Sequence, residues 1–162
     1  MSRLLVVHHS PTRGVAALTE SVLAGAGDDA IEGVEVVVRA ALEADADDVL
    51  AADGYLLGTP ANFGYMSGAL KHFFDSIFLE AGGALTDDGS ASSAGGGKRP
   101  FGLWVHGRYD TTGAVRSVET IVGALPWRQA APVLEVLGEP SEEQLAGAYE
   151  LGATLAALLA AG

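Results

Sequence analysis

The chain has 162 residues, a formal charge of −12 at pH 7, 49% hydrophobic residues and no cysteine. The length favours one domain over residues 1–162 with a core of its own, and the missing cysteine excludes disulfides, thiolate metal sites and a cysteine nucleophile. The acidic charge argues against nucleic acid as a partner, since phosphate backbones are bound by clustered Lys and Arg. No apolar run reaches the length of a membrane span and no secretory signal opens the chain, so we expect a cytoplasmic protein.

The first half of the chain predicts three strands and two helices. Residues 3–8 predict a first strand, whose apolar run is continuous from residue 4 to residue 7, as in a strand covered on both faces. A polar turn leads from them into a helix that ends at the glycines of residues 25–27. Residues 34–39 carry charges and predict an edge strand, and a short helix with an acidic first turn is expected at 44–50. The apolar run at 54–58 predicts a third, buried strand.

The second half begins with a helix that Ser67 is placed to cap. Its apolar positions recur at helical spacing: Leu70, Phe73, Phe74, Ile77 and Phe78. Residues 81–99 are rich in Gly and Ser without periodicity, and we interpret them as a mobile loop. A fourth strand is expected at 101–106 and a fifth at 131–137, with a helix between them. A capping box at 141–144 opens the last helix.

Strands and helices alternate five times, which predicts an α/β fold with helices on both faces of a parallel sheet. The first, third and fourth strands are the most apolar, whereas the second and fifth carry charges. We therefore expect a doubly wound five-stranded parallel sheet in the order 2-1-3-4-5. Such sheets bind ligands at the carboxyl ends of their central strands.

The stretch Gly58–Asp75, GTPANFGYMSGALKHFFD, joins the third strand to its helix. A proline, glycines and two aromatic residues at a strand end suit a planar heterocycle. The stretch resembles the flavin-ring loop of the flavodoxin-like family, especially its NAD(P)H:quinone oxidoreductase and FMN reductase branch. The resemblance implies FMN as the cofactor, with its isoalloxazine lined by Pro60, Ala61, Asn62, Phe63, Gly64 and Tyr65. The alternative is an ordinary strand–helix connection whose aromatics pack on the core.

The turn after the first strand offers hydroxyls, free amides and a guanidinium at a helix N-terminus, which is the chemistry of a phosphate site. The residues concerned are Ser10, Thr12, Arg13, Gly14 and Val15. The turn resembles the family's phosphate loop, whose hydroxyl-x-hydroxyl opening is matched by Ser10 and Thr12. The next three positions lack two of the family's usual donors, and Arg13 supplies a charge instead. The alternative is a helix start in which Ser10 or Thr12 serves only as a cap.

The turn after the fourth strand holds His106, Gly107, Arg108 and Tyr109. The resemblance implies that this turn meets the pyrimidine edge of the flavin. There Gly107 offers backbone amides, and a cation from His106 or Arg108 would stabilise reduced flavin. The alternative is a solvated surface loop. All three turns follow strands one, three and four, so we expect them to converge at one site.

The resemblance implies an FMN-binding oxidoreductase that takes hydride from NAD(P)H and reduces quinones or similar small acceptors. Because the flavin carries this chemistry, we name no catalytic side chain and no metal ligand. Two alternatives stay open: an electron carrier that docks to redox proteins, and a flavin-free domain that binds another phosphorylated ligand or a protein. Residues 81–99 could form a lid or the contact of a homodimer.

Overall fold

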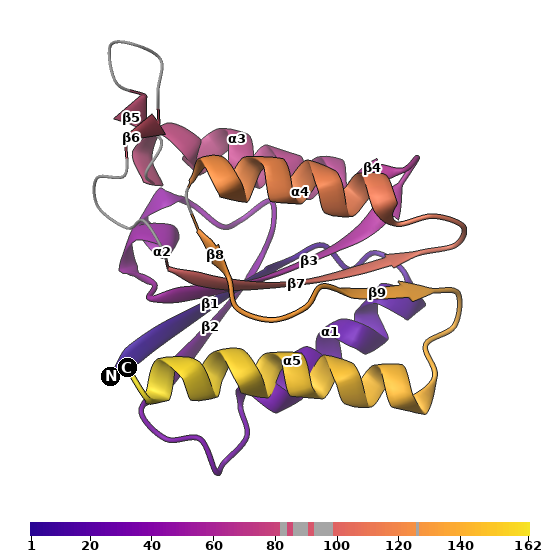
Figure 1. Ribbon diagram of the computed structural model, residues 1–162, viewed down its shortest axis with the longest axis horizontal. Coiled ribbons are helices and arrows are strands. Elements are labelled where there is room, and N and C mark those ends of the chain that lie inside the picture. The colour runs from indigo at the N-terminus through magenta and orange to yellow at the C-terminus, as the bar shows by residue number, and fades with distance from the viewer. Residues whose placement is uncertain (82–83, 86–90, 93–98, 126) are drawn as a thin grey trace.

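The computed structural model describes residues 1–81, 84–85, 91–92, 99–125 and 127–162. Its central sheet runs in the order β2-β1-β3-β7-β8, and these pairs are parallel (Figure 1). The bounds are β1 (Ser2–His8), β2 (Val34–Ala40), β3 (Gly54–Asn62), β7 (Pro100–Gly107) and β8 (Arg128–Gln129). β9 (Leu134–Leu137) also pairs with β7 in parallel. The predicted α/β class is confirmed, and the strands follow the predicted order 2-1-3-4, with two short strands, β8 and β9, in the place of the fifth.

Helices cover both faces of the sheet (Figure 1). One face carries α1 (Arg13–Ala26) and α5 (Glu142–Ala160). The other carries α2 (Ala46–Ala51), α3 (Gly68–Ala81) and α4 (Thr112–Ala124). The amide of Leu70 donates to the hydroxyl of Ser67, and α5 opens with the capping box of Ser141 and Gln144, as predicted.

The central strands β1, β3 and β7 each contribute to two hydrophobic cores, because successive side chains point to opposite faces of a sheet. In β1, Leu4 and Val6 pack with α1 and α5, whereas Leu5 and Val7 belong to the core on the other face. Trp104 is fully buried on the α1–α5 side, and its indole lies over Gly58 of the neighbouring strand. A Cβ at Gly58 would come within 2.0 Å of that ring, so glycine is required there.

The fifth strand differs from the prediction of one strand over 131–137. It is divided into β8 and β9, which lie on the same edge of β7 and are separated by residues 130–133. Pro132 lies in this interruption, and proline has no amide to donate to the ladder. The start predicted for this strand is therefore wrong, and its end at Leu137 is correct.

Two further short pairings fall where the sequence predicted loops. β3 continues to Asn62 and turns back into β4 (Tyr65–Met66). Within the predicted mobile loop, β5 (Ala84–Leu85) pairs with β6 (Ala91–Ser92) in antiparallel fashion. Residues 82–83, 86–90 and 93–98 of that loop lie outside the described residues, so its mobility stays a prediction. Every helix in the described part of the chain is too short or too polar to cross a bilayer.

Candidate functional site

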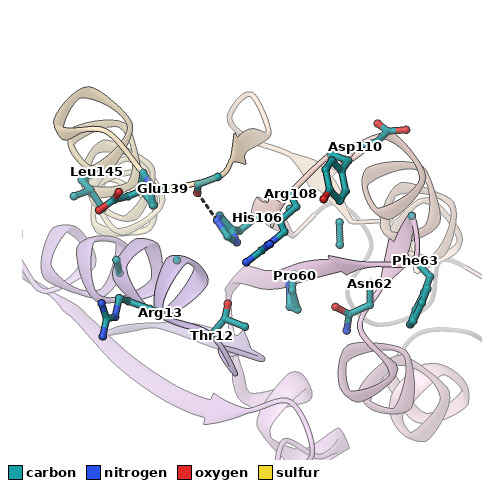
Figure 2. Close-up of a pocket in the computed structure, with 18 residues that line it drawn as sticks. Thr12, Arg13, Pro60, Asn62, Phe63, His106, Arg108, Asp110, Glu139 and Leu145 are labelled. Carbon is teal, nitrogen blue, oxygen red and sulfur yellow. Dashed lines mark hydrogen bonds between the residues drawn. The ribbon is translucent and has the colours of Figure 1, made fainter.

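A cavity of about 1300 Å³ opens at the carboxyl ends of the central strands (Figure 2). Its walls come from four segments: the start of α1, the end of β3, the turn after β7 and the turn between β9 and α5. Twelve of the residues predicted from the sequence line it together: Thr12, Arg13, Gly14, Pro60, Ala61, Asn62, Phe63, Gly64, His106, Gly107, Arg108 and Tyr109. The three predicted turns therefore do converge.

The N-terminal end of α1 forms one wall of the cavity. Thr12 is the N-cap residue, yet its side chain makes no capping hydrogen bond. Figure 2 shows the Thr12 hydroxyl turned toward the cavity. Among the described residues, the amides of Arg13, Gly14 and Val15 have no hydrogen-bond partner. The first turn of α1 thus presents free N–H groups and the positive end of the helix dipole, which favour an anion.

His106 lies against Gly14, where an added Cβ would come within 2.4 Å of the ring atom Cε1. The Nε2 of His106 lies 2.6 Å from the carbonyl oxygen of Gly138, in the turn before α5 (Figure 2). Because a carbonyl only accepts, Nε2 carries the proton of this bond. His106 therefore ties the β7 turn to the start of α1 and to the turn before α5.

Ser10, Val15 and Tyr65 were also predicted to bind the cofactor, and the structure does not place them on the cavity wall. The Ser10 hydroxyl lies 2.8 Å from His8 Nδ1 and 2.8 Å from the hydroxyl of Thr19. Val15 is fully buried in the core, which leaves only its amide facing the helix end. Tyr65 is on β4, and 43% of its surface is exposed.

The hydrogen bonds of Ser10 belong to a network beneath the cavity. Thr19 also accepts a hydrogen bond from the indole nitrogen of Trp104, at 3.2 Å. Burial, with a smaller contribution from the neighbouring His9, lowers the pKa of His8. Desolvation thus favours the neutral form of His8 beside Ser10. The network fixes the turn that carries Thr12.

The tip of the β3–β4 hairpin consists of Phe63 and Gly64, with φ of 53° and 74°. Two successive residues with positive φ are typical of a type I′ turn, which suits a two-residue hairpin. Phe63 is the one non-glycine residue with positive φ in the described part of the chain, and its side chain is 107% exposed. A bulky side chain in this conformation is strained.

The hairpin tip rests against the first turn of α4. A Cβ on Gly113 would come within 1.9 Å of the carbonyl oxygen of Gly64. The missing side chain at Gly113 therefore allows the hairpin to approach α4 and fixes the end wall of the cavity.

The turn after β7 contributes a cation, an aromatic ring and a carboxylate. Arg108 is exposed and has no ion-pair partner among the described residues. Figure 2 shows its guanidinium pointing toward the side of the cavity where His106 and Thr12 lie. Tyr109 is 87% exposed. The amide of Thr112 donates to Asp110, and this hydrogen bond lowers the pKa of the Asp110 carboxyl, which stays ionised at neutral pH.

The chain resembles known proteins in sequence and in fold. No family model matches it. The chain is 31% identical, over an alignment 175 positions long, to a flavodoxin from Aquifex aeolicus (strain VF5), with 96% of this chain and 86% of that protein covered. The chain belongs to the flavodoxin family.

One further relative matches part of the chain, and solved structures of low sequence identity share its fold. An NAD(P)H dehydrogenase (quinone) from Acidithiobacillus ferrooxidans (strain ATCC 53993 / BNL-5-31) is 34% identical over 95 residues, which are 46% of each chain. The fold matches an archaeal flavodoxin with a TM-score of 0.77 at 14% identity, over 97% of this chain and 98% of that one. It also matches a WrbA-like flavodoxin from Agrobacterium tumefaciens, with a TM-score of 0.73 at 20% identity over 98% of both chains. The apo form of an NADH:FMN oxidoreductase matches this fold with a TM-score of 0.72 at 15% identity, over 98% of this chain and 90% of that one.

Flavodoxins bind FMN, so the cofactor predicted from the sequence is confirmed for the family. The residues of this chain fit that group. Unpaired amides and the Thr12 hydroxyl suit its phosphate. At the other end of the cavity, the exposed rings of Phe63 and Tyr109 suit a flat heterocycle.

Sequence reasoning missed six residues that line the cavity: Ala17, Asp110, Gly138, Glu139, Pro140 and Leu145. Four of them belong to the turn after β9 and to the start of α5. The available signal was topological, because this turn also follows the carboxyl end of a parallel strand. Ala17 lies one helical turn after Arg13 and so shares its face of α1.

Proposed function

We propose that this flavodoxin-family protein is an NAD(P)H-dependent oxidoreductase that reduces quinones or similar small acceptors through bound FMN. When bound, FMN supplies the exchange of hydride and electrons. The chain supplies the binding, the orientation and the electrostatics, and the proposal needs no acid or base among its side chains.

The phosphate is assigned to the first turn of α1. The amides of Arg13, Gly14 and Val15 and the hydroxyl of Thr12 would donate hydrogen bonds to it. Ser10 would hold the turn through its bonds to His8 and Thr19. Each charge-assisted hydrogen bond contributes roughly 1.5–3 kcal/mol, so the loss of two family donors is compatible with binding when Arg13 adds its charge.

The ring is assigned to the space between the hairpin and the turn after β7. Pro60, Ala61 and Asn62 line its floor, with Gly64 at the tip, and Tyr65 would act by supporting the hairpin. Gly107 ends the neighbouring strand β7 and Arg108 follows it, directly after His106, which pairs with Pro60 in the register of β3 and β7. The guanidinium of Arg108 would stabilise the negative charge that reduction places on the pyrimidine edge.

The observation that carries the enzyme proposal is the exposure of Phe63. An aromatic side chain that is 107% exposed, at a strained φ of 53°, gives a small planar molecule a surface to stack on at the open end of the cavity. The relative named NAD(P)H dehydrogenase (quinone) supports this proposal over the 46% of the chain that it matches.

A second candidate function is electron transfer to a protein partner. It is favoured by the formal charge of −12 and by the flavodoxin relative, which matches 96% of the chain. An acidic surface steers a basic redox partner into contact. In that case the exposed rim of Phe63 would contact the partner protein instead of a small acceptor.

Anaerobic reduction distinguishes the two candidates. The protein loaded with FMN is mixed with NADH or NADPH, and the visible absorbance of the flavin is followed. We expect bleaching by one of the nicotinamides and recovery of the absorbance when a benzoquinone is added. Reduction by dithionite but by neither nicotinamide would contradict the enzyme and leave the carrier.

A further inference from the structure

The two edges of the central sheet differ in how well they are protected. At one edge, β8 and β9 are short and are separated by residues 130–133, which include Pro132. At the other edge, β2 extends over seven residues without proline or glycine, and its outer side pairs with no other strand in the described part of the chain. A long, unbroken edge strand is a template for pairing with another chain.

The backbone of β2 alternates between its neighbour β1 and the free edge. At one end of this parallel pair the amide of Ser2 donates to the carbonyl oxygen of Gly33, and at the other end the amide of Ala41 donates to that of His8. The alternation between these two bonds directs the odd-numbered residues of β2 toward β1. The amides and carbonyls of the even-numbered residues therefore point outward.

The outward-pointing groups belong to four apolar residues: Val34, Val36, Val38 and Ala40. Their side chains are half-buried or exposed. The carbonyl oxygen of Val38 accepts a hydrogen bond of 3.1 Å from Nη1 of Arg39. Because a carbonyl oxygen has two lone pairs, this bond leaves room for a backbone amide from another chain.

The sequence of β2, VEVVVRA, is complementary to itself about its centre, Val37. An antiparallel copy centred there sets Val36 opposite Val38 of the other copy, and Glu35 opposite Arg39 of the other copy. The first pair joins outward-pointing groups and can exchange two backbone hydrogen bonds, whereas the second is one of the closer pairs without backbone bonds. Opposite charges that face each other across antiparallel strands stabilise the pairing.

Other symmetric registers of β2 lose this match. A centre at residue 35 or 39 would set two like charges opposite each other, which destabilises an antiparallel pair. A centre at residue 36 or 38 would leave both charged side chains without a charged counterpart. The charges of the strand therefore select the register centred on Val37.

We propose that β2 pairs with β2 of a second copy of this chain, antiparallel about a two-fold axis at Val37, so that the two sheets become one. Within one chain, Glu35 lies 2.9 Å from Arg3. Arg39 lies 3.3 Å from Asp48. In the dimer these ion pairs join into rows of alternating charge across the interface. The walls of the cavity come from other segments, so the inference is independent of the proposed function.

The test is sedimentation velocity of the purified protein over a range of concentrations. We expect the mass of the sedimenting species to rise from 16.5 kDa toward twice that value. Glu35→Arg and Arg39→Glu each set like charges opposite each other in both symmetric pairs, so each variant alone should dimerise at least about tenfold more weakly. An equimolar mixture of the two variants restores opposite charges in both pairs and should dimerise as the wild type does.

A second pair of variants tests the backbone bonds. Val38→Pro removes an outward-pointing amide that β1 does not use, whereas Val38→Ala keeps this amide. We expect Val38→Pro to weaken the dimer at least about tenfold and Val38→Ala to weaken it by less than about threefold. A thermal melt of each variant checks that it folds.

Three results would overturn the inference: a wild type that stays monomeric at every concentration, a dimer that Glu35→Arg and Arg39→Glu leave intact, or a mixture of these two variants that dimerises no better than either alone. Recovery in the mixture cannot come from the folding of one chain, because neither variant is altered by mixing. It therefore reports the contact between the two copies of β2.

Discussion

The imidazole of His106 occupies the space that a side chain at Gly14 would need: the distance from the added Cβ to Cε1 would be 2.4 Å. The same ring is bonded through Nε2 to the carbonyl oxygen of Gly138. Three segments that are distant in the sequence are thereby held in one arrangement around the start of α1.

This contact predicts strong coupling between the two residues. Gly14→Ala should push the ring away, break its bond to Gly138 and lower the free energy of unfolding by roughly 1–3 kcal/mol. In a His106→Ala background, the same change should cost much less, because the clashing ring is gone. Urea unfolding of the two single variants and the double variant measures the coupling. Additive effects would contradict the contact.

Phe63 is predicted to strengthen the binding of FMN while it lowers the stability of the folded protein. Phe63→Asn creates Asn-Gly, the preferred pair for a type I′ turn, and should raise the unfolding free energy of the flavin-free protein by roughly 1–2 kcal/mol because the positive φ is no longer strained. The same variant should weaken the binding of FMN, because it removes a stacking contact that contributes roughly 0.5–1.5 kcal/mol.

Tyr109→Asn is the matched control for Phe63→Asn. Tyr109 is also exposed and lines the cavity, but its φ is not positive. We therefore expect Tyr109→Asn to weaken FMN without stabilising the protein. If Phe63→Asn gained no stability, or left FMN binding unchanged, the role assigned to Phe63 would be wrong.

Arg13 is predicted to act on the phosphate. Arg13→Gln should weaken the binding of FMN, because it removes a charge-assisted contact that contributes roughly 1.5–3 kcal/mol. The affinity for riboflavin should be nearly unchanged, because riboflavin has no phosphate. Arg116→Gln, an exposed change on α4 away from the cavity, controls for net charge. Equal weakening of FMN and riboflavin by Arg13→Gln would place the phosphate elsewhere.

Stability should depend on pH through His8. Its folded pKa is lowered from 6.5, first by burial and then by His9, so the unfolded chain binds the proton more readily. The contribution of His8 is therefore fully present above pH 6.5 and is lost as the pH falls from there through the folded pKa.

The measurement for His8 is urea unfolding between pH 8 and about 5.5. His8→Asn keeps a hydrogen-bonding group near Ser10 and should flatten the fall in stability below pH 6.5. His72→Asn, at an exposed position of α3, should leave the fall in stability below pH 6.5 unchanged. An unchanged pH profile in His8→Asn would show that other groups cause the fall.

The strand order and the three converging turns could be predicted from the sequence, because apolar runs and turn residues are local signals. The interruption of the fifth strand at Pro132 could have been read from the same signals. The hairpin at Phe63 could not, since phenylalanine rarely adopts positive φ. Nor could the contact of His106 with Gly14, or the cavity wall at Leu145, because both depend on how helices and turns distant in the sequence pack together.

The most direct test of the central claim is a series of two-dimensional amide NMR spectra of this 16.5 kDa protein during titration with FMN. We predict that the amide signals of Arg13, Gly14 and Val15 shift together with those of residues 61–64 and 107–109, and that all of them saturate at one equivalent. Signals elsewhere in the chain should move much less. Binding that shifts another surface while the amides of Arg13 to Val15 stay in place would contradict the account.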